Sequence, residues 1–376
     1  MIVRTPPMGW NSWNTFGSKI NEELIKTTAD AMVDEGLLDA GYNYLVIDDC
    51  WAEFTRDENH RLVPSKEKFP NGMKAVADYV HSKGLKFGMY SCSGTLTCAG
   101  YPSSFQYEYI DAKTFASWGV DFLKYDYCFR PMNVPGDVLY KRMGMALANC
   151  GRDILFSACN WGADDSHTWI KTTGAHMWRS TGDINDSWQS VKDLYAKQIP
   201  LQPYNGKGCF NDMDMLIVGM NGKGNVAVSG CTTEEYRTHF SMWAFFGSPL
   251  MIGCDIRNMT PETKEILLNK DVIAINQDAA QRQPFSIKDH WGASNLWVKQ
   301  LDGGDLAVAF FNIADSEQWP YLNLSDIGLD HSMGLKVRAK NVWTGEDYGE
   351  FRDVIRVGGV KPHATLLLRC KLVEDN

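Results

Sequence analysis

The sequence has no long apolar run and no long run of basic residues. Its 376 residues include 37 Lys and Arg against 46 Asp and Glu, which gives a formal net charge of -9. A membrane-spanning helix needs about 20 consecutive apolar residues, so we expect no membrane segment. Nucleic-acid binding draws its affinity from clustered Lys and Arg, so we expect no nucleic-acid partner either.

Histidine is scarce, and the cysteines form no CxxC pair. The chain has 8 His and 10 Cys, with no HxH or HExxH motif, so the spacings that are typical of zinc sites are missing. We therefore expect no metal ion and no cofactor. Most cysteines, such as Cys159, lie in apolar surroundings and are interpreted as small buried side chains. Cys98 and Cys128 are compatible with a disulfide, but spacing alone does not decide their pairing.

The first residues, MIVRTPPMGW, lack the charged segment and apolar core of a secretory signal peptide. We therefore expect a cytoplasmic protein, or a secreted one if a leader has been removed. The sequence leaves the oligomeric state open, and a homo-oligomer is compatible with it.

Short apolar runs alternate with helix-like segments over residues 1–280. The strand-like runs are 6–13, 42–51, 85–91, 120–128, 153–161, 175–183, 209–216 and 249–256, and the helix-like segments are 21–36, 73–84, 111–119, 136–151, 164–174, 186–199, 232–247 and 260–276. Eight such units predict a (β/α)8 TIM barrel, whose typical size is about 250 residues. A doubly wound open sheet is the alternative, but no GxGxxG follows the first strand.

Residues 281–376 have a different pattern. The segments 295–301, 305–312, 335–343 and 363–372 are typical of strands, and 302–305, 344–347 and 357–360 are typical of turns between them. No long helical pattern interrupts them. This part of the chain therefore predicts a C-terminal antiparallel β-sandwich domain.

Polar residues gather at the ends of the predicted barrel strands. Lys124, Asp126 and Cys128 alternate, so they point to one side if the strand continues. Other strand ends supply Trp10, Trp13, Asp48, Asp49, Tyr90, Asn160, Arg179, Asp183, Asp212, Asp214 and Asp255. A single Asp after a strand usually caps a helix, but so many at one rim cannot all be caps. Because catalytic residues of a barrel come from these ends, we expect the active site there.

Two of these carboxylates suit glycoside hydrolysis, in which one attacks the anomeric carbon and the other protonates the leaving oxygen. Asp126 suits the first role, since Lys124 on the same face would favour its ionised form. Asp183 suits the second, although Arg179 nearby would lower its pKa and oppose that role.

Tryptophans flank the same strand ends, at positions 10, 13, 51, 161 and 178. Aromatic faces stack on the C–H faces of sugars, although a Trp beside a strand also packs between strand and helix. A non-catalytic sugar-binding protein would keep these aromatics, but only an enzyme needs both Asp126 and Asp183. A metal-dependent isomerase or hydrolase is a further alternative. A chelator would inactivate it, and we expect no such loss.

Six segments together resemble glycoside hydrolase family 27, which contains α-galactosidases and α-N-acetylgalactosaminidases. They are RTPPMGWNSWNTF, YLVIDDCW, the run from Cys98 to Cys128 ending in LKYDYC, RSTGDINDSW, FNDMDML and DVIAINQD. The resemblance runs nearly the whole chain, in order. It implies a retaining exo-α-galactosidase that acts on α-galactosides without a metal, built as a barrel followed by an antiparallel β-domain.

The resemblance also implies roles for individual residues. Asp126 would be the nucleophile and Asp183 the acid/base. The other implied contacts are Asp48 and Asp49 with the galactose 4- and 6-hydroxyls, Lys124 and Arg179 with hydroxyls near the nucleophile, Trp13 and Tyr90 with the ring, and Asp214 closing the pocket. In secreted relatives the cysteines that match Cys98 and Cys128 form a disulfide in the pocket wall.

One departure from the family pattern concerns the sugar's 2-substituent. Many α-galactosidases carry CEW, with a Glu that contacts the 2-hydroxyl, where this chain has CNW and Asn160. Ala163 is small where relatives have bulky residues that exclude an N-acetyl group. We therefore keep α-N-acetylgalactosaminidase as the second candidate. The intact pair Asp48–Asp49 favours a substrate with a 6-hydroxymethyl group over an arabinopyranoside.

Overall fold

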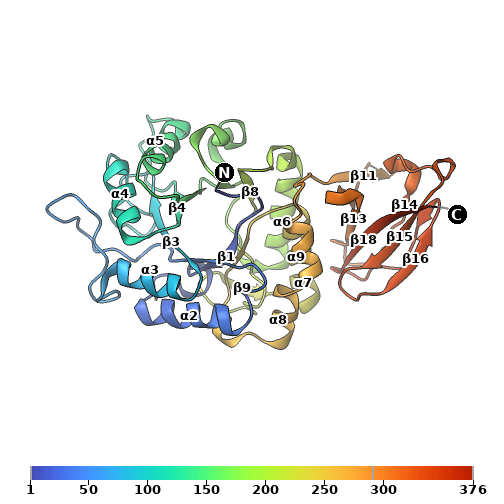
Figure 1. Cartoon of the computed structure of the whole chain (residues 1–376), viewed down its shortest axis with the longest axis horizontal. Coiled ribbons are helices and arrows are strands. Elements are labelled where there is room, and N and C mark those ends of the chain that lie inside the picture. The colour runs from blue at the N-terminus through green and yellow to red at the C-terminus, as the bar shows by residue number, and fades with distance from the viewer. Residues whose placement is uncertain (1, 290–291, 375–376) are drawn as a thin grey trace.

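The computed structural model describes residues 2–289 and 292–374, which form a barrel and a smaller sheet domain beside it (Figure 1). The barrel is an eight-stranded parallel sheet in the order β10-β1-β2-β3-β4-β5-β6-β8. Its strands are β1 (Met8–Asn11), β2 (Tyr44–Val46), β3 (Lys86–Cys92), β4 (Phe122–Asp126), β5 (Leu155–Ala158), β6 (Met177–Arg179), β8 (Phe210–Asp212) and β10 (Leu250–Ile252). A parallel bridge between Leu216, which follows β8, and Ile252 in β10 connects the two ends of this strand order. The predicted barrel is confirmed, and the open doubly wound alternative is wrong.

Helices surround the barrel, and most begin at a side chain that caps the first turn. They are α1 (Trp13–Phe16), α2 (Glu22–Asp34), α3 (Gly72–Ser82), α4 (Glu108–Trp118), α5 (Gly136–Ala148), α6 (Trp188–Gln198), α7 (Thr233–Phe245), α8 (Pro261–Leu267) and α9 (Lys270–Asn276). Ser187 caps α6, and Thr260 caps α8 with Pro261 at its first position. The predicted helix over 260–276 is two helices, because the Asn269 side chain accepts from two backbone N–H groups and starts α9.

The predicted helix over 164–174 is wrong. The segment forms two short 3-10 helices, η1 (Ala163–Thr168) and η2 (Ile170–Thr173). Asp164 and Asp165 have φ angles of 55° and 49°, in the left-handed region, which interrupts a right-handed helix. Tyr127 Oη donates a 2.5 Å hydrogen bond to Asp164. The remaining 3-10 helices are η3 (Ile199–Tyr204), η4 (Ile256–Asn258), η5 (Asp302–Gly304), η6 (Leu324–Ile327) and η7 (His331–Met333).

The C-terminal domain is the predicted antiparallel β-sandwich. Its main sheet has the order β11-β12-β13-β18-β15-β16, and the short pair β14-β17 lies against it. The strands are β11 (Phe285–Asp289), β12 (Gly292–Gln300), β13 (Leu306–Phe311), β14 (Leu322–Asn323), β15 (Leu335–Asn341), β16 (Asp347–Phe351), β17 (Val354–Ile355) and β18 (Thr365–Glu374). Two further short strands, β7 (Asp186–Ser187) and β9 (Ala227–Gly230), pair beside the barrel. Within the described residues, no helix is long and apolar enough to cross a lipid bilayer.

Alternate residues of the main C-terminal sheet pack in opposite directions. Trp297, Ala309 and Phe311 join the core of the barrel, whereas Leu296 and Val308 join the cluster under β14 and β17. One face of the sheet is therefore fixed to the barrel and the other faces away from it.

A buried lysine strengthens this junction. Lys299 Nζ donates to the carbonyls of Phe245 over 3.2 Å and Ile275 over 3.0 Å, in the last turns of α7 and α9. Burial lowers the pKa of Lys299 to about 8. A cation is favoured at helix C-termini, so this residue ties two barrel helices to the sheet.

Candidate active site

A cavity of about 230 Å³ lies at the C-terminal ends of the barrel strands. It is lined by the residues to which the family resemblance gave site roles, namely Trp13, Asp48, Asp49, Tyr90, Cys98, Lys124, Asp126, Cys128, Arg179, Asp183 and Asp214. Asn160 and the other strand-end candidates Trp10, Asp212 and Asp255 do not line it. The other lining residues are Asn14, Trp161, Ile184, Met215 and Val226. Of these, the sequence had marked only Trp161. Asn14 lies in α1 beside Trp13, and Ile184, Met215 and Val226 are apolar loop residues, so no sequence pattern marks these four.

Two adjacent carboxylates after β2 are held in different ways. Asp48 Oδ2 accepts from Lys124 Nζ and from Asn11 Nδ2, both over 2.8 Å. Asp49 Oδ2 instead accepts from the backbone N–H of Ala99 over 2.9 Å. Burial raises the pKa of Asp49 despite this bond. The site thus presents an acidic pair in a fixed orientation, with one member neutralised by a lysine.

Asp126 is the buried carboxyl at the end of β4. Tyr90 Oη donates to its Oδ2 over 3.1 Å, and the Tyr127 N–H donates to its Oδ1 over 2.9 Å. Burial raises the pKa of Asp126 to about 6, and this exceeds the opposite effect of Lys124. Lys124 thus favours the ionised form of Asp126, but burial has the larger effect on its pKa, and the Lys124 ammonium pairs directly with Asp48.

Arg179, at the end of β6, joins two further carboxylates. Its Nη2 donates to Asp183 Oδ1 over 2.8 Å, and its Nη1 lies 2.9 Å from Asp214 Oδ1. The Asp183 side chain is 72% exposed, whereas the Asp214 side chain is only 9% exposed. Burial acts to raise the pKa of Asp183, but Arg179 and Lys124 together hold that pKa below its ordinary value.

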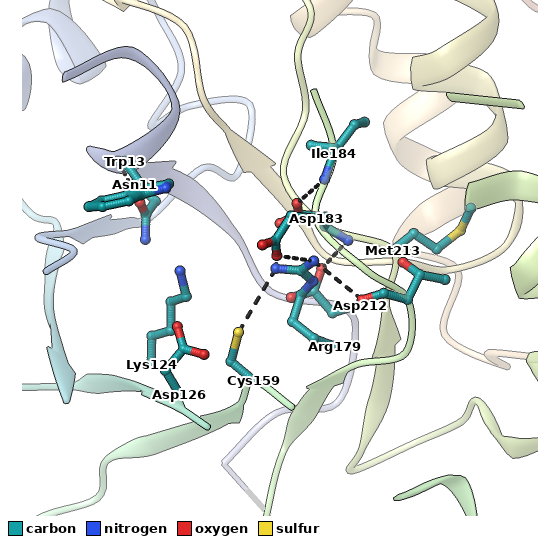
Figure 2. Close-up of polar contacts among 12 residues, drawn as sticks. Asn11, Trp13, Lys124, Asp126, Cys159, Arg179, Asp183, Ile184, Asp212 and Met213 are labelled. Carbon is teal, nitrogen blue, oxygen red and sulfur yellow. Dashed lines mark hydrogen bonds and ion pairs between the residues drawn. The ribbon is translucent and has the colours of Figure 1, made fainter. Parts of the chain in front are cut away.

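The two candidate catalytic carboxyls come from different sides of the site. Figure 2 shows Asp126 beside Lys124, and Asp183 beside Arg179 across from them. Asp183 is close enough to Asp126 to raise its pKa further. A buried carboxyl with a raised pKa and an exposed one with a lowered pKa therefore face the same cavity.

Asn160 lies outside this arrangement. Its side chain is fully buried, and its Nδ2 donates to the Ala163 carbonyl over 2.9 Å. The next residue, Trp161, has a φ angle of 58° and lines the cavity. The left-handed turn thus brings the aromatic side chain of the CNW triplet to the cavity, and strand alternation could not predict this.

Cys98 and Cys128 form a disulfide in the cavity wall. The bridge holds the loop that carries Ala99, whose N–H group binds Asp49. Both sulfur atoms lie within 4.8 Å of the Asp126 carboxylate, a grouping that could suggest a metal site. The sulfur atoms are bonded to each other, however, and are not the thiolates that bind metals.

Removing this bridge is expected to destabilise the protein. The cysteines are 30 residues apart in sequence, so the double variant Cys98→Ala/Cys128→Ala should lose about 3–4 kcal/mol of unfolding free energy. Thermal unfolding under non-reducing conditions measures the loss. Cys150→Ala, at a half-buried free thiol, is the control and should melt nearly as the wild type does. Equal melting temperatures for all three proteins would contradict a constraining bridge.

Two family models match the chain. The one described as "Alpha galactosidase A" matches residues 5–278, and the one described as "Alpha galactosidase C-terminal beta sandwich domain" matches residues 291–370. The first match alone covers most of the chain and contains all the cavity residues.

Two relatives and a solved structure agree with this match. The α-galactosidase of Cyamopsis tetragonoloba is 47% identical over 343 residues, covering 91% of this chain and 80% of the relative. That of Coffea arabica is 48% identical, covering 90% and 86%. The crystal structure of α-galactosidase I from Mortierella vinacea is 35% identical with a TM-score of 0.88, covering 98% of this chain and 97% of that one. The chain therefore belongs to glycoside hydrolase family 27, the α-galactosidase family.

Proposed function

We propose that this enzyme removes terminal α-linked galactose from oligosaccharides or glycoconjugates, with Asp126 as nucleophile and Asp183 as acid/base. The observation that carries the assignment is the pair of unlike carboxyls at one cavity, Asp126 buried and Asp183 exposed, in a chain of the α-galactosidase family. An exposed carboxyl can exchange protons with water and with a leaving group. A buried one is placed for attack on a bound ring.

The reaction proceeds in two displacements. In the first, an Asp126 oxygen bonds to the anomeric carbon while the bond to the leaving oxygen breaks, and Asp183 gives its proton to that oxygen. In the second, Asp183 takes a proton from water, the water oxygen bonds to the anomeric carbon, and the bond to Asp126 breaks. Each displacement inverts the carbon, so the galactose is released with its α configuration retained.

The first step needs the proton on Asp183, whereas the free site favours it on Asp126. Arg179 causes much of this difference, because its guanidinium holds Asp183 in the ionised form. A substrate hydroxyl that accepts from Arg179 would weaken that contact and let Asp183 take the proton. We infer that substrate binding reverses the proton order, and that the pair must carry one proton in total for the first step.

The remaining cavity residues suit a neutral sugar. Asp48 and Asp49 offer carboxylate oxygens to the 4- and 6-hydroxyls, and Lys124 offers a donor next to them. Trp13 and Tyr90 supply aromatic surface for the ring. Asp214 pairs with Arg179 Nη1 over 2.9 Å and so keeps that guanidinium in place.

The identity of the 2-substituent is the second question. The Asn160 side chain does not line the cavity, so it does not contact the 2-substituent. The 2-substituent is contacted instead by residues that line the cavity, including Trp161. A second candidate, α-N-acetylgalactosaminidase, requires space for an acetamide in a cavity of about 230 Å³ that Trp161 helps to line. We therefore favour galactose.

Two p-nitrophenyl substrates test this choice. The wild-type protein should hydrolyse p-nitrophenyl α-galactoside with a kcat/KM roughly 100-fold or more above that for the α-N-acetylgalactosaminide. Proton NMR of the first product should detect α-galactose before mutarotation. Cleavage of a β-galactoside with neither α-linked substrate cleaved would refute the function. A first product of β configuration would refute the retaining mechanism.

A further inference from the structure

The C-terminal domain carries a second cavity, of about 330 Å³, which is larger than the catalytic one. Leu296 and Phe310 in its wall belong to the apolar cluster on the face of the sheet that points away from the barrel. Figure 1 places these strands at one end of the long axis and the barrel at the other. The second cavity is therefore separate from the active site.

Two exposed aromatic side chains stand at this cavity. Trp319 is 65% exposed and Tyr321 is 45% exposed, with only Pro320 between them. Large aromatic side chains are usually mostly buried, so an exposed pair at a concave surface points to a ligand. The volume of the cavity, about 330 Å³, lies in the range of pockets that bind small ligands.

The backbone that carries the two rings is fixed on both sides. Gln318 and Val360 exchange backbone hydrogen bonds of 3.0 and 2.7 Å, and Leu322 pairs with Ile355 beyond the aromatic pair. Asn312, which is buried, donates from Nδ2 to the Val360 carbonyl over 2.9 Å. The rings are therefore presented by an ordered segment, which reduces the entropy lost when a ligand binds.

The polar residues of the cavity suit a neutral ligand that is rich in hydroxyls. Lys288 and Asp326 supply one charge of each sign, and Gln318 and Asn323 supply amides that both donate and accept. Asn323 Nδ2 lies 3.1 Å from Asp326 Oδ2, so donor and acceptor are side by side. Two exposed aromatics cover far less area than a stable contact with a second copy of the chain requires. A carbohydrate fits this combination better.

We propose that this surface, the Trp319 site, binds the neutral glycan chain that bears the α-galactosyl groups, with Trp319 and Tyr321 stacking on its sugar rings. The nature of that chain rests on the proposed function. Binding here would hold the enzyme on a polymer while the barrel cavity removes end groups, which raises the effective concentration of those groups.

Affinity electrophoresis in gels that contain soluble galactomannan tests the proposal. The wild-type protein should be retarded, and Trp319→Ala/Tyr321→Ala should migrate about as in a gel without polysaccharide. Tyr109→Ala, at an aromatic that is 48% exposed on α4, is the matched control and should be retarded like the wild type. At dilute galactomannan the double variant should release galactose about tenfold more slowly, with kcat/KM for p-nitrophenyl α-galactoside within about twofold of the wild type.

Each other outcome overturns the proposal. Equal retardation of all three proteins, or no retardation of the wild type, means that the Trp319 site does not bind the glycan. A wild-type protein that elutes as a dimer, and a double variant that elutes as a monomer, would assign the surface to self-association. Trp319→Phe/Tyr321→Phe keeps an aromatic ring at both positions and should keep most of the retardation, which separates loss of stacking from misfolding. Failure of the proposed function is different, because the wild type would then not hydrolyse the small substrate.

Discussion

Asp126→Asn is expected to lower kcat/KM for p-nitrophenyl α-galactoside by roughly three to five orders of magnitude. The variant keeps the size of the side chain but removes the oxygen that bonds to the anomeric carbon. The Tyr127 N–H can still donate to the amide oxygen over the contact that is 2.9 Å in the wild type, so the backbone should not move. Initial rates at saturating and limiting substrate measure the loss.

The same variant is expected to be more stable than the wild type at pH 7. The pKa of Asp126 is about 6 in the folded protein and about 3.8 in the unfolded chain, so the folded state holds this proton more tightly. The protonated Asp126 carboxyl therefore contributes fully to the free energy of unfolding below pH 3.8, and this contribution is lost as the pH rises to 6. Above pH 6 the buried charge costs up to about 3 kcal/mol, which Asn does not incur. The gain in melting temperature should vanish near pH 3.8.

A matched control and a chemical rescue distinguish the nucleophile from other carboxylates. Asp255 also follows a barrel strand, but it caps η4 and binds Arg257 outside the cavity. Asp255→Asn should therefore keep activity within about threefold and lose less than about 1 kcal/mol of stability, because Asn caps a helix as well as Asp and only the partly exposed pair with Arg257 is lost. Azide should rescue Asp126→Ala by attacking the anomeric carbon directly, with one inversion, to give β-galactosyl azide. An Asp126→Asn variant with near wild-type activity would remove Asp126 from the nucleophile's role.

Much of the fold was predictable because its signals are local. Eight apolar runs, each followed by a helical segment, repeat often enough to specify a barrel, and Ser187, Thr260 and Pro261 mark helix starts by their own chemistry. The segment 164–174 failed because its conformation depends on left-handed backbone at Asp164 and Asp165, which residue type does not reveal. The short strands β14 and β17 were missed because two-residue ladders have no periodicity.

The site was predictable to the extent that strand ends and family motifs determine it. Strand alternation placed Lys124, Asp126 and Cys128 on one side, and the cavity contains all three. The contacts among them were not predictable. Distances between strands that are far apart in sequence decide which carboxylate Lys124 pairs with. They also decide whether burial or the nearby charges have the larger effect on the pKa of Asp126. Asn160 was misleading for a local reason, because the turn after β5 directs its amide to the Ala163 carbonyl and away from the cavity.

Asp183→Asn is expected to reverse the pH dependence of the first chemical step. In the wild type, kcat/KM should fall above pH about 6, because the pair Asp126–Asp183 then loses the one proton that the step requires. In the variant, a substrate with a good leaving group needs no acid, and only Asp126 must be ionised. Its kcat/KM for 2,4-dinitrophenyl α-galactoside should therefore rise with pH to a plateau. The midpoint should lie below that of the wild-type pair, since the Asp183 charge that raises the pKa of Asp126 is gone.

The leaving group provides the second half of this prediction. Asp183→Asn should retain kcat/KM for the dinitrophenyl substrate within about tenfold, but it should lose roughly 100-fold to 10,000-fold on raffinose, whose leaving oxygen must be protonated. Asp214→Asn is the matched control, because it also removes a carboxylate from Arg179. This variant should lower kcat/KM for both substrates by a similar factor, and its kcat/KM should still fall above pH 6. If Asp183→Asn behaves as Asp214→Asn does, Asp183 orients Arg179 and is not the proton donor. If the two variants differ in both slope and leaving-group dependence, the exposed carboxyl is the acid that the buried nucleophile requires.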